Sequence, residues 1–154
     1  MSNYSRRSLL LSGLASLSLS LLSGKSWGDA NPKIFEAASL AEAIKALAGK
    51  EQPLPSNRLL LELPEISAEP HRISIRMRSE LPGTDMMLLI VEKAMQPVAA
   101  QFTIPTGTEA DIRTFIKVPG TTSVHLIVQA GGKLYTARKQ IKIAQPFNSK
   151  QLAG

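Results

Sequence analysis

Between residues 59 and 143 the chain contains short runs in which apolar and polar residues alternate, and this period of two constrains the fold more than any other feature. Ile73, Ile75 and Met77, for example, alternate with arginine and serine. Because successive strand side chains point to opposite faces, such runs favour strands with one buried face. The run 86–91 is apolar throughout, which is typical of a strand buried on both faces. These patterns predict seven strands, at residues 59–63, 72–78, 86–91, 100–104, 111–118, 123–129 and 135–143.

Turn-forming residues separate these runs, including Pro-Gly-Thr-Asp, Pro-Thr-Gly-Thr and Gly-Gly segments. No helix-length crossover lies between the predicted strands, which disfavours a parallel α/β sheet. Short strands at fairly even spacing are typical of an antiparallel sandwich. The sequence therefore predicts a mostly β protein with an immunoglobulin-like β-sandwich of about seven strands.

One helical segment is expected before the strands, over Asn31–Gln52. Ser39 and Glu42 have the spacing of a capping box, and apolar residues follow at helical intervals. Gly49 stands where a C-terminal cap belongs. We expect this short N-terminal helix to be stabilised mainly by docking on another surface, because short isolated helices are marginally stable in water.

The segment Ser5–Leu22 begins with paired arginines, Arg6 and Arg7, followed by an apolar run that contains several serines. The run is shorter than the roughly 20 residues needed to cross a bilayer and fits the core of a cleavable signal peptide. Paired arginines in this position resemble the twin-arginine export motif. We expect a periplasmic protein exported by the twin-arginine machinery, without a stable membrane anchor and with cleavage near Gly28 or Ala30. An ordinary secretory signal and an uncleaved helix are the alternatives.

The expected organisation is a signal peptide at 1–28, a helix plus sandwich domain at 29–144, and a polar flexible tail at 145–154. Removal of residues 1–28 takes three of the 18 basic residues and none of the 12 acidic ones, so the net charge falls from +6 to +3. This excess is too small to indicate nucleic-acid binding.

No cysteine occurs in the sequence, which excludes disulfides, thiolate nucleophiles and cysteine-ligated metals. The two histidines, His71 and His125, lack neighbours at metal-binding spacing and are interpreted as surface or rim residues. No nucleotide-binding or hydrolase motif is present. We therefore assign no catalytic, cofactor-binding or metal-binding residue, expect no cofactor, and predict that the protein is not an enzyme. Arg72, Arg76 and Arg78 form a basic strand face, which is the candidate partner-contact surface.

Several segments together resemble the sulfur-oxidation carrier family SoxY. "EAIKALAG" (Glu42–Gly49) precedes "LELPEISAEPHRISIRM" (Leu61–Met77), as a helix precedes an "LPEIA" strand end in that family. "QPVAAQFTIP" (Gln96–Pro105), "EADIRTFIKV" (Glu109–Val118) and "AGGKLYTARKQIKI" (Ala130–Ile143) resemble later family segments in the same order. The resemblance implies an immunoglobulin-like sandwich that forms a heterodimer with a second sandwich protein, SoxZ, in thiosulfate oxidation.

In the SoxY family a C-terminal "GGCGG" arm carries the sulfur substrate on its cysteine. Here "AQPFNSKQLAG" follows Ile143 without a cysteine, so the carrier activity is not transferred to any residue. The favoured hypothesis is a non-catalytic periplasmic SoxY-like protein that binds a SoxZ-like partner. A genuine carrier subunit, whose cysteine arm is supplied by another chain or was lost by truncation, is one alternative. An unrelated periplasmic sandwich with a chaperone, adhesion or binding role is another.

Overall fold

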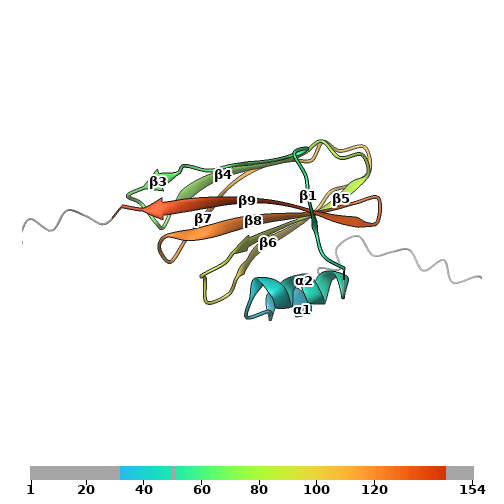
Figure 1. Ribbon diagram of the computed structural model, residues 1–154. Coiled ribbons are helices and arrows are strands. Elements are labelled where there is room, and N and C mark those ends of the chain that lie inside the picture. The colour runs from blue at the N-terminus through green and yellow to red at the C-terminus, as the bar shows by residue number, and fades with distance from the viewer. Residues whose placement is uncertain (1–31, 50, 145–154) are drawn as a thin grey trace, which may run out of the picture.

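The computed structural model describes residues 32–49 and 51–144. Two β-sheets face each other, and two short helices cover the outer face of the larger sheet (Figure 1). The predicted signal peptide, its cleavage site and the predicted tail lie outside the described residues. Within the described ranges, no helix is long and apolar enough to span a membrane.

The larger sheet has six strands, with the order β1-β9-β8-β5-β6 and with β3 also paired to β9. The four long strands are antiparallel, and the two-residue strands β1 and β3 run parallel to β9. A two-residue Gly131-Gly132 turn joins β8 to β9, and both glycines have the positive φ that such tight hairpin turns require. The strands are β1 (Leu54–Pro55), β3 (Ile66–Ser67), β5 (Thr84–Val91), β6 (Val98–Thr103), β8 (Thr122–Ala130) and β9 (Lys133–Ile143).

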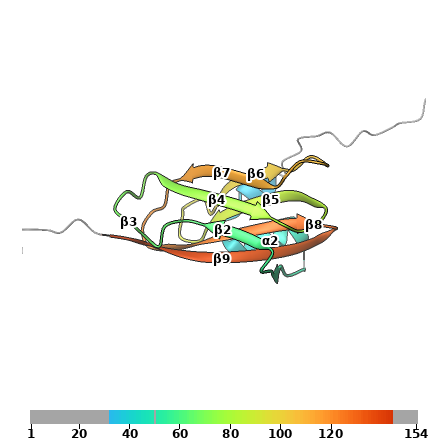
Figure 2. The same ribbon diagram turned by 90° about the horizontal axis from the view of Figure 1, so that it is seen from above.

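The smaller sheet has three antiparallel strands in the order β2-β4-β7. It consists of β2 (Leu59–Glu62), β4 (Ile73–Ser79) and β7 (Asp111–Ile116). Seen from above, β2 lies on the same side of the sandwich as β9, and β7 lies on the same side as β6 (Figure 2). All seven predicted strands are confirmed, and the two missed strands, β1 and β3, are only two residues long.

The inward-facing residues of both sheets form the main core, as the period-two pattern predicts. Alternate residues of each strand are buried here, while their neighbours face outward. Because β5 is an internal strand of the larger sheet, covered by the smaller sheet on one face and by the helices on the other, all of its residues from Met86 to Val91 are buried. The fully or almost fully buried members include Ile73, Ile75, Met77, Met87, Leu89, Val91, Val124, Leu126, Val128 and Ile141.

A second core lies between the outer face of the larger sheet and the helices α1 (Pro32–Phe35) and α2 (Leu40–Ala48). Ile34 and Ala43 of the helices are buried there against the sheet. The sheet contributes Met86, Leu88, Ile90, Val98, Ile127 and Leu134. Docking of the helical segment is therefore confirmed, and the surface on which it docks is the outer face of the larger sheet.

The prediction of one helix over 31–52 is wrong, because α1 ends at Phe35 and α2 begins only at Leu40, after the N-cap Ser39. Ser39 has extended backbone angles, and its hydroxyl accepts a hydrogen bond from the Glu42 N–H at 3.2 Å, so it caps α2 as expected. The Glu42 carboxylate reaches back to the N–H of Ala38 at 2.8 Å rather than to that of Ser39. Gly49, with φ 66°, ends α2 as predicted.

Candidate partner-binding surface

The outer face of the smaller sheet carries a ladder of charged side chains. Strand register places Glu62 of β2 and Arg113 of β7 on either side of Arg76, while Asp111 lies opposite Arg78. These residues project outward because Ile75 and Met77, their neighbours on β4, are buried in the core. Both helices cover the other sheet, and among the described elements none covers this face.

Arg76 is held firmly within this ladder. Its Nε donates to Oδ1 of Asp111 at 3.0 Å and its Nη2 donates to Oδ2 at 2.5 Å, which is the two-point geometry preferred by guanidinium and carboxylate. A Glu62 oxygen lies 3.7 Å from Nη1 on the other side. The hydrogen bond from Arg76 lowers the pKa of Asp111, and the same bond raises the pKa of Arg76.

The other two arginines predicted from the sequence also lie on or beside this face. Arg78 has its Nη2 3.4 Å from Glu109 and its Nε 4.0 Å from Glu80. The guanidinium of Arg72 lies over the ring of Phe115, 4.5 Å from its centroid, which is a cation–π contact. The phenylalanine is 56% exposed, so the pair presents a flat apolar surface with a charged edge.

Two further cations border this face that the sequence reasoning did not select. Arg113 of β7 is exposed, and Lys139 comes from β9 of the other sheet. Neither forms an ion pair with a described residue. Together they border a shallow depression of about 550 Å³ that spans the two sheets. Its lining residues are Glu62, Leu63, Pro64, Ser74, Ile75, Arg76, Arg113 and Lys139.

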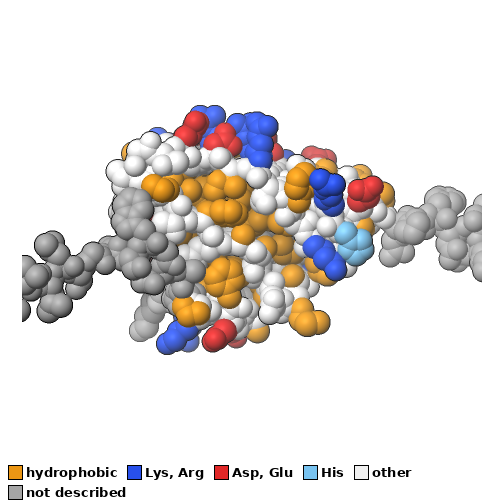
Figure 3. Space-filling view, turned by 180° about the vertical axis from the view of Figure 1, so that it is seen from behind, with side chains coloured by type: hydrophobic (Ala, Val, Ile, Leu, Met, Phe, Trp, Pro, Cys, Tyr) orange, Lys and Arg blue, Asp and Glu red, His pale blue; other side chains and the backbone are white. Residues whose placement is uncertain are grey.

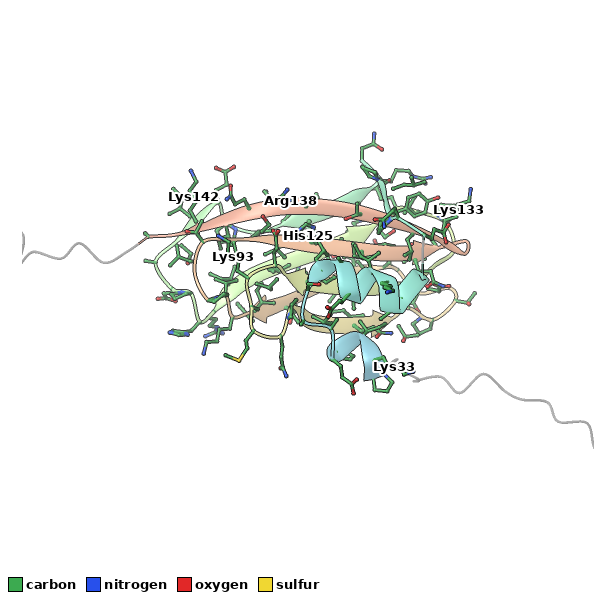
Figure 4. The ribbon with its side chains drawn as sticks, turned by 60° about the horizontal axis from the view of Figure 1, so that its bottom comes forward. Lys33, Lys93, His125, Lys133, Arg138 and Lys142 are labelled. Atoms are coloured by element: carbon green, nitrogen blue, oxygen red, sulfur yellow. The ribbon has the colours of Figure 1, made fainter. Side chains whose placement is uncertain are left out.

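A second polar cluster lies where the end of β5 and the start of β8 meet the middle of β9. His125 is paired in register with Arg138, and the two side chains lie on neighbouring strands (Figure 4). Arg138 Nη2 donates to the Ser123 hydroxyl at 2.8 Å and lies 3.9 Å from Glu92. The hydrogen bond from Ser123 lowers the pKa of Glu92, and the charges of His125 and Arg138 act in the same direction.

His125 is buried, with 8% of its surface exposed, so its interpretation as a surface or rim residue is wrong. The residue lies on the predicted outer side of β8, but the second core extends over that side. Its Nε2 has no hydrogen-bond partner among the described residues and lies 3.5 Å from a Glu92 oxygen, which is an electrostatic contact rather than a formed hydrogen bond. Burial lowers the pKa of His125, and Glu92 opposes this shift only in part.

The charged ladder of the smaller sheet lies on an open surface. In the part of the chain that the structure describes, no group of three or more histidine, cysteine, aspartate or glutamate side chains is placed to hold a metal ion. The charged side chains lie on open sheet faces, where water screens them, rather than in an enclosed site. Charged groups on an exposed sheet face provide orientation and selectivity for a protein partner.

The two packed antiparallel sheets define an immunoglobulin-like β-sandwich. A family model described as "Sulfur oxidation protein SoxY" matches residues 44–145, and the chain belongs to this family. No curated protein matches the chain in sequence. The family resemblance inferred from the sequence is thus confirmed, including the absence of the arm cysteine.

Solved structures agree with this assignment. The sulfur carrier protein SoxY from Chlorobium limicola f thiosulfatophilum superposes with a TM-score of 0.64 at 25% identity, covering 71% of this chain and 96% of that one. The superoxide reductase (neelaredoxin) from Ignicoccus hospitalis gives a TM-score of 0.51 at 18% identity, covering 57% of this chain and 81% of that one. At that identity the second match shows the fold alone.

Proposed function

We propose that this protein is a periplasmic, non-catalytic SoxY-like protein that forms a heterodimer with a SoxZ-like β-sandwich protein during oxidation of sulfur compounds such as thiosulfate. The observation that carries the proposal is the combination of a SoxY fold with a sequence that contains no cysteine. A family member with this composition retains a folded surface for partners but has no thiol of its own for the substrate.

The chemistry of sulfur carriage supports a role without covalent chemistry on this chain. Sulfur transfer requires a thiolate nucleophile, and thiolates form readily because the thiol pKa lies near 8.5. Serine and threonine hydroxyls are weak nucleophiles unless an adjacent base activates them. Of the described serines, Ser123 donates toward Glu92 and accepts from Arg138, which occupies its hydroxyl in a structural cluster.

The expected export route supports partnership. Twin-arginine export carries proteins that have already folded, and the sequence shows no motif for a cofactor that would require folding in the cytoplasm. A partner without its own signal peptide that folded onto this sandwich would be exported together with it. Arg6 and Arg7 would then address the complex rather than one chain.

The arginine face remains the candidate contact surface for charged groups of the partner. Arg72 contacts the exposed Phe115 ring and Arg78 contacts the exposed Glu109, whereas Arg76 is bound to Asp111 at two points. The double variant Arg72→Ser, Arg78→Ser leaves the Arg76–Asp111 pair intact. We expect it to slow association with the partner and to reduce the salt dependence of the association rate, since exposed charges act mainly on the on-rate.

Co-expression with the SoxZ-like protein of the same organism tests the proposal. Size-exclusion chromatography with light scattering should show one complex of the two chains in a 1:1 ratio. Separate elution of two folded proteins would contradict it. A SoxY-type protein of the same organism that retains its cysteine is a positive control for the partner.

A second candidate function is that of a genuine carrier subunit whose thiol comes from another chain. The SoxY family assignment supports this candidate, because the solved SoxY structure is that of a sulfur carrier protein. Exposure of the isolated complex to thiosulfate together with a two-electron oxidant separates the two, because a thiol joins thiosulfate through a new S–S bond only with the loss of two electrons. A mass increase on a thiol of the partner indicates a carrier complex, whereas unchanged masses of both chains favour the non-covalent role. The alternative of an unrelated sandwich is excluded by the family assignment.

A further inference from the structure

The two sides of the sandwich differ in how well they are closed. On the side of β2 and β9, the two strands lie in contact across the sandwich, and the inward-facing Leu59, Leu61 and Ile141 are all at least 92% buried, although Tyr135, Ala137 and Ile143 of β9 are only partly buried. On the side of β6 and β7, the inward-facing Ala100, Phe102 and Ile112 are only half-buried, although they pack against the same core. Unlike β2 and β9, β6 and β7 are not in close contact with each other, so the sandwich is open along them and apolar core side chains reach the surface there.

Figure 3 looks at this open side. Apolar side chains gather in the middle of the face, and both basic (Lys, Arg) and acidic (Asp, Glu) side chains lie along its upper margin. Exposed apolar surface of this kind, bordered by charged groups, is typical of a protein interaction site.

β6 is an edge strand of the larger sheet, and its outer edge pairs with no described strand. Its sequence, Val98-Ala-Ala-Gln-Phe-Thr103, contains no charged residue and no proline. Proteins commonly protect exposed edges with lysine, proline or covering segments. The opposite end of this sheet is protected in that way, because β1 and β3 cover β9, which also carries four basic residues between Lys133 and Lys142.

A side-chain oxygen on β6 is also left without a partner. Oε1 of Gln101 is buried and accepts no hydrogen bond from any described residue. Buried acceptors are normally satisfied, and an unpaired one costs roughly 1–3 kcal/mol. The register of Gln101 with Leu88 places this side chain on the helix-covered face of the larger sheet, so the docking argument rests on the free backbone edge of β6.

The charges beside the opening define the chemistry of such a strand. β6 contributes none, and on the segment from Asp111 to Val118 the only carboxylate is already bound to Arg76. Arg113 and Lys117 are exposed and form no ion pair within the described ranges. A complementary strand would therefore be neutral or apolar along β6 and would carry carboxylates toward Arg113 and Lys117.

We propose that the partner docks at this opening by adding an extended strand to the edge of β6, with apolar side chains covering Phe102 and Ile112 and acidic side chains facing Arg113 and Lys117. Main-chain hydrogen bonds to β6 would supply affinity, and the alternate side chains would supply specificity. This inference rests on the proposed function, because the strand is assigned to the SoxZ-like partner.

Two charge-matched variants of the full mature chain test this docking. Ala99→Lys places a charge on an exposed position of β6, and Gln140→Lys places the same charge on an exposed position of β9, so neither removes a core side chain. Ala99→Lys should weaken binding of the SoxZ-like partner about ten-fold or more, and Gln140→Lys should leave it within about two-fold. Both variants should melt close to the wild type.

Hydrogen exchange of the wild-type complex gives a readout that is independent of the variants. Amides in 98–103 should exchange more slowly in the complex than in the free chain, because a docked strand hydrogen-bonds the free edge of β6. Complex formation without this protection and with equal affinity of both variants would overturn the inference and leave the proposed heterodimer standing. Absence of any complex with the wild type would contradict both.

A test for self-association distinguishes the SoxZ-like partner from a second copy of this chain at the β6 edge. If the purified chain alone forms a dimer that Ala99→Lys abolishes, the occupant of the β6 edge is a second copy and the assignment to the partner is wrong. The double variant Arg113→Glu, Lys117→Glu reverses the two charges beside the opening. It should slow association with the partner and should not promote self-association.

Discussion

Arg76 and Asp111 form a two-point ion pair across strands β4 and β7, with Nε 3.0 Å from Oδ1 and Nη2 2.5 Å from Oδ2. The strand register places Arg113 opposite Arg76, so this contact is diagonal rather than directly across the ladder. The pair fixes Arg76 in place, whereas Arg72 and Arg78 on the same face do not contact Asp111 and remain the candidates for contact with a partner.

Acid should weaken the smaller sheet through this pair. The pKa of Asp111 is lowered in the folded protein by the Arg76 hydrogen bond, so the pair contributes stability above the unfolded pKa of 3.8 and loses it as the pH falls through the lower, folded value. Asp111→Asn should therefore flatten the fall in melting temperature below about pH 4. Thermal unfolding at several pH values measures this effect, with Asp85→Asn, an exposed change on β5, as control. An unchanged acid profile in Asp111→Asn would contradict it.

The helical layer should contribute a true second core. Leu88 and Leu89 are neighbours on β5 and both are completely buried, but Leu88 faces the helices and Leu89 faces the smaller sheet. Leu88→Ala and Leu89→Ala should each lower the free energy of unfolding by about 2–5 kcal/mol. Denaturant unfolding measures both values. A cost below about 1 kcal/mol for Leu88→Ala would show that the helices pack only loosely on the sheet.

Mild acid should destabilise the end of the sheet that contains His125. Burial lowers the pKa of His125 below 6.5 in the folded protein, so the unfolded chain binds the proton more readily. Stability should be constant above about pH 6.5, fall as the pH drops through that value, and level off once folded His125 is also protonated. Glu92, Arg138 and Ser123 are the groups that face it, and they do not reverse this direction.

His125→Gln removes the titrating group and should abolish the step near pH 6.5, as measured by thermal unfolding from pH 5 to 8. The matched control is His71→Gln, since His71 is exposed on a loop before β4. A step that persists in His125→Gln and disappears in His71→Gln would show that His71, and not His125, causes the pH dependence, and would contradict this prediction.

How much of the fold follows from the sequence differs between elements. The alternation of Ile73, Ile75 and Met77 predicts a strand with one buried face, and the continuous run 86–91 correctly predicts an internal strand that is buried on both faces. The alternation does not specify the division into a six-stranded and a three-stranded sheet, because the inward-facing residues of both sheets are apolar and show the same period of two. β1 and β3 were missed because a two-residue strand shows no period.

The candidate surface was predicted only in part, for a related reason. Arg72, Arg76 and Arg78 share one strand face and are visible as a run in the sequence. Arg113 and Lys139 approach them through strand pairing and sheet packing, which local sequence does not specify. The burial of His125 was missed because a period of two places it on the outer side of β8 but does not reveal that the second core extends over that side.

Export should depend on the twin arginines and should carry the partner as well. Replacement of Arg6 and Arg7 with lysine should retain both this protein and the SoxZ-like partner in the cytoplasm. Cell fractionation with antibodies against each chain measures this, and substitution of Lys25, a basic residue that is not part of the pair, is the control. Normal export of the partner in the double lysine variant would contradict joint export.

Intact-mass analysis of the native complex, isolated from the periplasm of cells grown without and with thiosulfate so that the cell supplies the oxidant, tests the central claim most directly. We predict one copy of this chain, shortened at its N-terminus, bound to one copy of the SoxZ-like protein, with no sulfur adduct on this chain under either condition. A solitary chain, or a thiosulfate-dependent mass increase on this cysteine-free chain, would contradict the account.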